Sequence, residues 1–123
     1  MFDSVKKASE LALEHLKPGV PGALIHQLAA KSMEEDGFQT GHDAQGRPCG
    51  FIHGLGHGVG LEIHEEPRLS PANPNPLAAG AVVSVEPGLY YPETGGVRLE
   101  DLVVLTPGGC ENFCTMPKEL EVP

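Results

Sequence analysis

Residues 53–67 read His53-Gly-Leu-Gly-His57-Gly-Val-Gly-Leu-Glu-Ile-His64-Glu-Glu-Pro67 and hold three of the six histidines of the chain. Glycine at this density excludes a stable helix, so His53 and His57 are not the paired ligands of a helical zinc protease. The spacing also fails the glycine pattern of dinucleotide-binding loops. Glycines allow a backbone to approach a ligand or an ion closely, and imidazole is a ligand for Zn, Co, Fe and Mn. The stretch therefore predicts a binding site built on a non-helical backbone.

Two glutamates stand in apolar surroundings downstream of these histidines. Glu86 ends the run Val-Val-Ser-Val-Glu, and Glu100 lies inside Val97-Arg-Leu-Glu-Asp-Leu-Val-Val104. A carboxylate that faces inward needs a partner, and a cation shared by both glutamates and a histidine would supply one. Taken one at a time, each glutamate fits a solvent-facing strand position better, because strand glutamates commonly face solvent. A lone histidine likewise fits a hydrogen-bonded core position.

Working outward, the apolar periodicity predicts helices over residues 3–17 and 21–36. Alternating or Val-rich segments predict strands, and four prolines predict an extended loop over residues 65–80. The expected strands are residues 50–53, 60–64, 81–86, 97–105 and 111–115. Two helices followed by antiparallel strands indicate an α+β fold.

Length and composition restrict the class of protein further. The 123 residues favour one domain, and the 16 glycines and 12 prolines indicate many tight turns. The net charge of −9 argues against nucleic acid and against an anionic membrane surface as partners. No apolar run is long enough to span a bilayer, and the N-terminus lacks the order of a signal peptide. We therefore expect a soluble, cytoplasmic protein.

The three cysteines, at positions 49, 110 and 114, are an odd number in a chain without an export signal. We expect buried or half-buried reduced thiols rather than disulfides or a zinc site.

Three ordered motifs carry a resemblance to a known family. They are the 53–67 stretch, Val85-Glu-Pro-Gly-Leu-Tyr90 and Val97-Arg-Leu-Glu-Asp101. With Leu16-Lys-Pro-Gly-Val20, they resemble the pita-bread metallopeptidases, and most closely the prolidase and aminopeptidase P branch. The resemblance covers nearly the whole chain. It implies half of a pita-bread fold, with two helices packed on a mainly antiparallel sheet.

The same resemblance implies a chemistry and a set of site residues. His57, Glu86 and Glu100 match metal ligands, and Glu100 matches the residue that bridges two ions. His53 and His64 match histidines that contact substrate, and Glu86 also matches a proton shuttle. The implied cofactor is a pair of divalent ions, Mn or Co first and Zn or Fe as alternatives. The implied reaction is hydrolysis of a peptide bond next to proline.

One departure from the family pattern sets an expectation about the whole chain. Two further aspartate ligands of the family lie on strands before the helix that matches residues 3–17, and no aspartate here stands in that context. The chain is therefore expected to be the C-terminal part of a catalytic domain, residues 1–123, with weak or no activity alone. A non-catalytic protein-binding module is the alternative. We also expect a homo-oligomer, because a missing half would bare a sheet edge and an apolar face.

Overall fold

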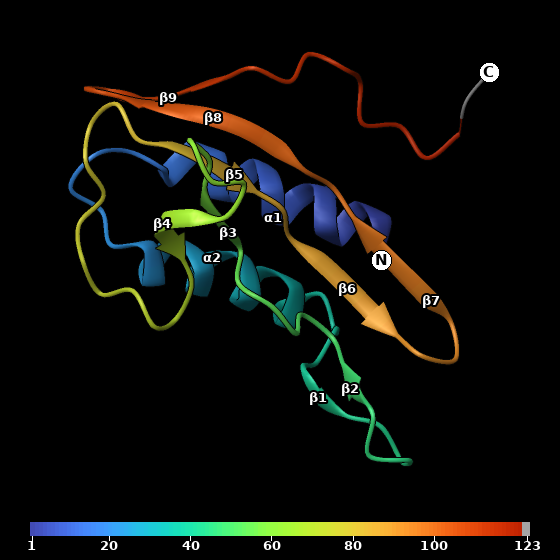
Figure 1. The fold of residues 1–123 in the computed structure, drawn as a ribbon. Helices are drawn as coiled ribbons and strands as arrows, with labels where there is room; N and C mark the ends of the chain where they lie inside the picture. Colours follow the sequence, from blue (N-terminus) through green and yellow to red (C-terminus); the bar gives the residue numbers. More distant parts are fainter. Residues whose placement is uncertain (122–123) are drawn as a thin grey trace.

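Two helices cover one side of the molecule in the computed structural model, which describes residues 1–121 (Figure 1). Helix α1 (Phe2–His15) buries Val5, Ala8 and Ala12 along one stripe. Leu16, which directly follows the helix, is buried as well. Helix α2 (Gly22–Glu35) follows Pro21, whose fixed φ suits the start of a helix. Gly37 has a φ of 95°, the left-handed conformation in which glycine ends many helices. Both predicted helices are confirmed, each ending within two residues of its expected terminus.

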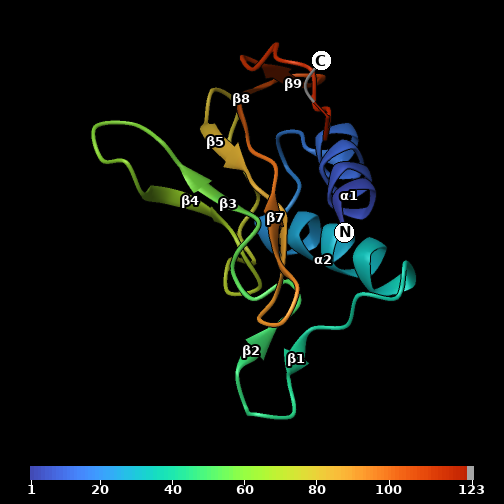
Figure 2. The same cartoon turned by 90° about the vertical axis from the view of Figure 1, so that its right-hand side faces the viewer.

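All strand pairings are antiparallel within the described part of the chain. The main sheet has five strands in the order β4-β3-β5-β8-β9, and two separate two-stranded ribbons, β1-β2 and β6-β7, accompany it. The bounds are β1 Gly41–His42, β2 Pro48–Cys49, β3 Gly56–Gly58, β4 Glu65–Leu69, β5 Val82–Val85, β6 Gly88–Tyr91, β7 Gly95–Arg98, β8 Asp101–Thr106 and β9 Gly109–Asn112. Figure 2 shows the β1-β2 ribbon and the β3-β4 hairpin projecting away from α1 and α2.

The predicted strand over residues 60–64 is wrong. That segment is a series of bends, and Leu61 and Ile63 are largely exposed. The alternation is typical of a half-buried strand, but no apolar surface within residues 1–121 covers these two side chains. The ladder forms on either side instead, in β3 and in β4, which lies inside the predicted 65–80 loop. Pro67 is tolerated in β4 because β4 is the edge strand of the sheet.

Two further strand predictions need correction. Residues 50–53 form no strand, and Gly50 makes only an isolated bridge to Tyr90. The predicted strand 97–105 is two strands of different sheets, β7 and β8, with Leu99 and Glu100 between them. The Leu99 N–H donates to Pro87 O, 3.3 Å away, at the point where the chain passes from the β6-β7 ribbon to the main sheet. The last strand is β9, shifted two residues before its predicted start.

The core lies between the helices and the sheet. Its fully or nearly fully buried apolar residues are Val5, Ala8, Ala12, Leu16, Ile25, Ala29, Met33, Phe51, Leu55, Leu69, Leu77, Val83, Val85, Leu89, Val103 and Leu105. Cys49 and Cys110 are half-buried free thiols, as expected, whereas Cys114 is exposed. Among residues 1–121, neither helix has the length and hydropathy that crossing a bilayer requires.

Candidate functional site

The two glutamates come together because the β5-β8 ladder stops just before them. Val85 pairs with Asp101 at the end of the ladder, so Glu86 and Glu100 are the next residues on the two strands. Neighbouring residues of a strand point to opposite faces. Val85 and Asp101 are fully buried on one face, and Glu86 and Glu100 both line a cavity on the other.

Glycines bring the histidine-rich segment against the same end of the sheet. A Cβ on Gly56 would lie 1.9 Å from Ser84 O, and a Cβ on Gly58 would lie 2.3 Å from Glu66 O. Only glycine fits at these two positions. The Glu86 N–H donates to Leu55 O at 2.7 Å, which anchors β3 beside the end of β5.

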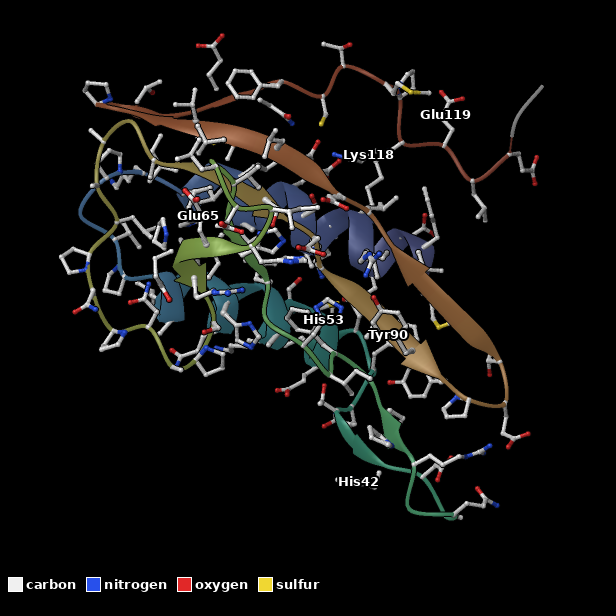
Figure 3. All side chains as sticks on the ribbon, in the orientation of Figure 1. His42, His53, Glu65, Tyr90, Lys118 and Glu119 are labelled. Carbon is white, nitrogen blue, oxygen red and sulfur yellow. The ribbon has the colours of Figure 1, made fainter. Side chains whose placement is uncertain are left out.

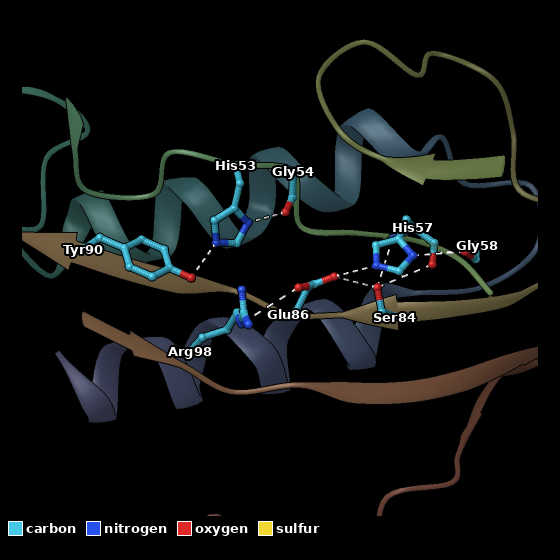
Figure 4. Close-up of polar contacts among 8 residues, drawn as sticks. All are labelled: His53, Gly54, His57, Gly58, Ser84, Glu86, Tyr90 and Arg98. Carbon is cyan, nitrogen blue, oxygen red and sulfur yellow. Dashed lines mark hydrogen bonds and ion pairs between the residues drawn. The ribbon is translucent and has the colours of Figure 1, made fainter. Parts of the chain in front are cut away.

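His57 and Glu86 are the two predicted metal ligands that the structure brings into direct contact (Figure 4). His57 Nε2 lies 3.0 Å from Glu86 Oε1, and both side chains are only 14% exposed. His57 Nδ1 lies 3.0 Å from Gly58 O, so Nδ1 carries the hydrogen. In a neutral ring, Nε2 then presents its lone pair to a carboxylate oxygen. Such an arrangement needs either a proton shared by the two atoms or a cation that binds both of them.

Two more residues hold Glu86 in place. The Ser84 hydroxyl lies 2.9 Å from Glu86 Oε1, and its oxygen accepts the His57 N–H at 3.1 Å. Arg98 Nε lies 4.0 Å from Glu86 Oε2. The carboxylate is therefore oriented before any ligand arrives.

His53 is fixed at both ring nitrogens (Figure 4). Nδ1 lies 2.7 Å from Gly54 O, and Nε2 lies 2.9 Å from the Tyr90 hydroxyl. Because Nδ1 faces a carbonyl oxygen it carries the hydrogen, and Nε2 accepts from Tyr90. The ring also packs edge-on against Phe51. Two hydrogen bonds and one ring contact therefore fix the orientation of His53.

Buried polar support continues behind His53. Phe51 stacks on His26 of α2, with ring centroids 4.9 Å apart. Burial lowers the pKa of His26, and the nearby His53 lowers it further. The neutral His26 ring accepts the Leu55 N–H at 3.2 Å, so α2 contacts the backbone between His53 and His57.

His64 and Glu100 belong to the same region but are held less firmly. The His64 ring packs edge-on against His57 at 4.4 Å, yet His64 is exposed. Glu100 is exposed and lines a cavity of about 380 Å³ with His57, His64 and Glu86. Within residues 1–121, no three His, Cys, Asp or Glu side chains lie close enough together to hold a metal ion. The structure thus joins His57 to Glu86 and leaves Glu100 outside that pair.

A second cavity, of about 570 Å³, shares His57, His64 and Glu86 with the first. It is lined by His53, Gly54, Gly56, His57, His64, Arg68, Ser70, Glu86 and Arg98. Of these, Arg68, Ser70 and Arg98 were not predicted as site residues from the sequence, nor were the supporting roles of Ser84 and Tyr90. Ser84 stands two residues before Glu86, and Tyr90 stands four residues after it. For Ser84 a signal was available, because a polar residue inside a Val-rich strand needs a hydrogen-bond partner when it is buried.

Comparison with known proteins identifies the family. The model of metallopeptidase family M24 matches residues 1–107. The chain belongs to metallopeptidase family M24. It is 38% identical over 120 residues to an Xaa-Pro dipeptidase of Pyrococcus furiosus, a match that covers 98% of this chain and 32% of that protein. It is 41% identical over 121 residues to an uncharacterized peptidase of Bacillus subtilis, covering 98% of this chain and 31% of that protein.

Solved structures of the same family agree with the predicted fold. An X-Pro aminopeptidase of Thermotoga maritima superimposes with a TM-score of 0.85 at 39% identity, over 96% of this chain and 31% of that one. The prolidase of Pyrococcus furiosus superimposes with a TM-score of 0.83 at 38% identity, over 94% of this chain and 32% of that one. The resemblance to pita-bread metallopeptidases and the α+β class are thus confirmed. The chain spans about a third of the length of these M24 relatives.

The side chains of His57 and Glu86 are of the types that bind divalent cations. M24 enzymes are metallopeptidases, and the pair that this chain brings together consists of one imidazole and one carboxylate, both common ligands of such ions. The lone pair of His57 Nε2 and the oxygen of Glu86 converge at a distance that a shared cation would make favourable. His57 also has the backbone hydrogen bond at its other nitrogen that orients most metal-binding histidines.

Proposed function

We propose that this chain carries part of a metal-dependent site that hydrolyses the peptide bond next to proline, as an Xaa-Pro dipeptidase or aminopeptidase does. The observation that supports the proposal most strongly is the convergence of His57 Nε2 and Glu86 Oε1 in an M24 chain. His57, Glu86 and Glu100 are the proposed metal ligands. Mn or Co are the proposed ions, with Zn or Fe as alternatives.

The roles of the residues follow from their chemistry. Bound divalent ions would polarise the scissile carbonyl and make water a better nucleophile. Glu86 would take a proton from the attacking water at a carboxylate oxygen and pass it to the leaving nitrogen. His53 and His64 would contact the substrate carbonyl as negative charge develops on its oxygen. For His53, this contact requires a hydrogen on Nε2, the nitrogen that accepts from the Tyr90 hydroxyl in the structure.

We propose a dipeptide as the preferred substrate. Arg68 lines the larger cavity with Glu86 and His53, and its ion-pair partner Glu66 is 3.9 Å away with a side chain that is 78% exposed. An ion pair this long and this exposed contributes little to stability. The Arg68 guanidinium therefore remains free to bind a substrate carboxylate. Arg68→Met should then raise KM for an Xaa-Pro dipeptide while leaving KM for its C-terminal amide unchanged.

We propose a cytoplasmic location and a homo-oligomeric assembly. Three free thiols suit the cytoplasm. Leu61 and Ile63 are 104% and 73% exposed beside the site, and we propose that a second copy covers them in a homo-oligomer. Light scattering of the wild type and of a Leu61→Ser, Ile63→Ser variant tests this, and a monomeric wild type at high micromolar concentration would refute it.

The decisive experiment measures bound metal and hydrolysis together. The chain is loaded with Mn²⁺, desalted and analysed for metal, beside His57→Ala and a His15→Ala control on the exposed end of α1. About one retained ion in the wild type and control, lost in His57→Ala, is the expected result. Hydrolysis of an Xaa-Pro dipeptide, compared with a matched Xaa-Ala dipeptide, then tests specificity. Absence of retained metal in all three proteins would contradict the proposal that His57, Glu86 and Glu100 hold a metal in this chain.

A further inference from the structure

Asp101 is a buried carboxylate for which the proposed chemistry has no use. It opens β8 directly after Glu100, and its side chain is fully buried. Ser9 of α1 donates to Oδ2 at 3.3 Å, Asn112 of β9 donates to Oδ1 at 2.9 Å, and Lys118 Nζ pairs with Oδ2. A buried carboxylate needs a compensating charge, and among residues 1–121 Lys118 is its ion-pair partner.

Lys118 belongs to the C-terminal segment, residues 113–119, which lies along the start of β8 (Figure 3). The Phe113 N–H donates to Leu102 O at 2.9 Å, and the Leu102 N–H lies 3.3 Å from Cys114 Sγ. The segment thus contacts two consecutive residues of β8, Asp101 and Leu102. The M24 family match ends at residue 107, so these contacts come from beyond it.

Glu100 has no such support of its own. Within the described residues its carboxylate makes no hydrogen bond or ion pair, and Leu99 and Glu100 lie between two strands. Its direction depends on the residue that follows. Because neighbouring strand residues point to opposite faces, holding Asp101 against α1 directs Glu100 toward the cavity that it shares with His57 and Glu86.

We infer that Asp101 and Lys118 are positioning residues for Glu100, and that the C-terminal segment sets the metal affinity of the site through them. The inference rests on the proposed role of Glu100 as a ligand. Lys118 neutralises Asp101, Asp101 holds the first residue of β8, and Glu100 is thereby presented to the ion. Without Lys118 the start of β8 loosens, and the third ligand loses its direction.

The test compares Lys118→Ala, Lys118→Arg and a control, Lys7→Ala, in the full chain. Lys7 also pairs with an aspartate, Asp36, at 2.7 Å, but on the exposed side of the helices. Calorimetric titration with Mn²⁺ should give an affinity about tenfold weaker for Lys118→Ala, as is usual when residues behind metal ligands are removed. Lys118→Arg should restore most of the affinity, and Lys7→Ala should bind as the wild type does.

A second readout needs no metal. Amide hydrogen exchange should increase in Lys118→Ala at residues 99–102 and stay unchanged at residues 82–85 of β5. Equal exchange at residues 99–102 in the variant and the wild type would overturn the inference, as would an increase spread evenly over both regions. If the wild type binds no metal, the proposed function loses its metal site, whereas the exchange result still decides the positioning role. Should Lys118→Ala fail to fold, Lys118→Gln, which keeps a hydrogen-bond donor, takes its place in both measurements.

Discussion

His57 and Glu86, here called the inner pair, are only 14% exposed and are held by hydrogen bonds, whereas His64 and Glu100, the outer pair, extend from segments exposed to solvent. The inner pair stands on the main sheet and is held by Ser84 and by backbone carbonyls. The outer pair stands on a bend and on a link between two sheets. The difference teaches that a site can be preorganised on one side by close backbone packing while its other side depends on more distant contacts. Four predictions test this contrast.

The largest effect is expected from filling the space behind the inner pair. In Gly56→Ala the new Cβ would lie 1.9 Å from Ser84 O, so β3 must move away from β5. We expect the free energy of unfolding to fall by about 3 kcal/mol, the upper range for overpacking. Urea denaturation measures this, with Gly108→Ala as the control because its Cβ would meet nothing within 4 Å. A loss below about 0.5 kcal/mol, the range of neutral surface changes, would contradict the close packing.

Metal should stabilise the chain through the inner pair. In the metal-free chain, Glu86→Gln should not lower the melting temperature, because an amide N–H can donate to His57 Nε2 where a carboxylate cannot. At Mn²⁺ concentrations of about 100 times Kd, the wild type should gain about 2.7 kcal/mol and Glu86→Gln little. Glu100→Gln should keep part of that gain. Thermal melts with and without Mn²⁺ provide the comparison. Equal gains for Glu86→Gln and the wild type would place the metal elsewhere.

The hydrogen bond from Tyr90 to His53 should contribute a smaller amount. Tyr90→Phe leaves Nε2 of His53 without its donor, and we expect a loss of about 1 kcal/mol in unfolding free energy. Tyr91→Phe is the matched control, because its hydroxyl also donates one bond, to Gln39 O at 3.0 Å, away from the site. The His53 ring signals in NMR spectra should shift in the first variant alone. Unshifted signals in Tyr90→Phe would show that the chain orients His53 by other means.

His26 should make stability depend weakly on pH. Burial lowers its pKa in the folded chain, so below about pH 6.5 the unfolded chain takes up a proton first. The free energy of unfolding should therefore fall as the pH drops from 6.5 toward the lowered pKa, and be unaffected above that window. His26→Gln should remove this part of the slope, and His15→Gln, at an exposed histidine, should retain it. Denaturation at several pH values between 4.5 and 7.5 tests the sign.

Much of the fold could be predicted from local patterns, and the failures have a common cause. The periodicity of α1 and α2 predicts both helices, since a buried stripe and a proline or glycine boundary are local signals. The strands of the histidine-rich region were misplaced. Gly56 and Gly58 have low intrinsic strand propensity, yet they pair because only glycine lets β3 approach Ser84 O and Glu66 O. Leu61 and Ile63 alternate as a strand does, yet they find no surface to pack on.

The candidate site divides in the same way. Contiguous motifs of the sequence were enough for the resemblance to the family, for the α+β class and for the proposed site residues that the resemblance implies, His53, His57, His64, Glu86 and Glu100. Only the tertiary structure decided which of them meet. The end of the β5-β8 ladder brings Glu86 to His57, while Tyr90 contacts His53 and Lys118 contacts Asp101 from segments 37 and 17 residues away. Such contacts depend on strand register and on the approach of one backbone to another, and neither is encoded in the neighbourhood of any single residue.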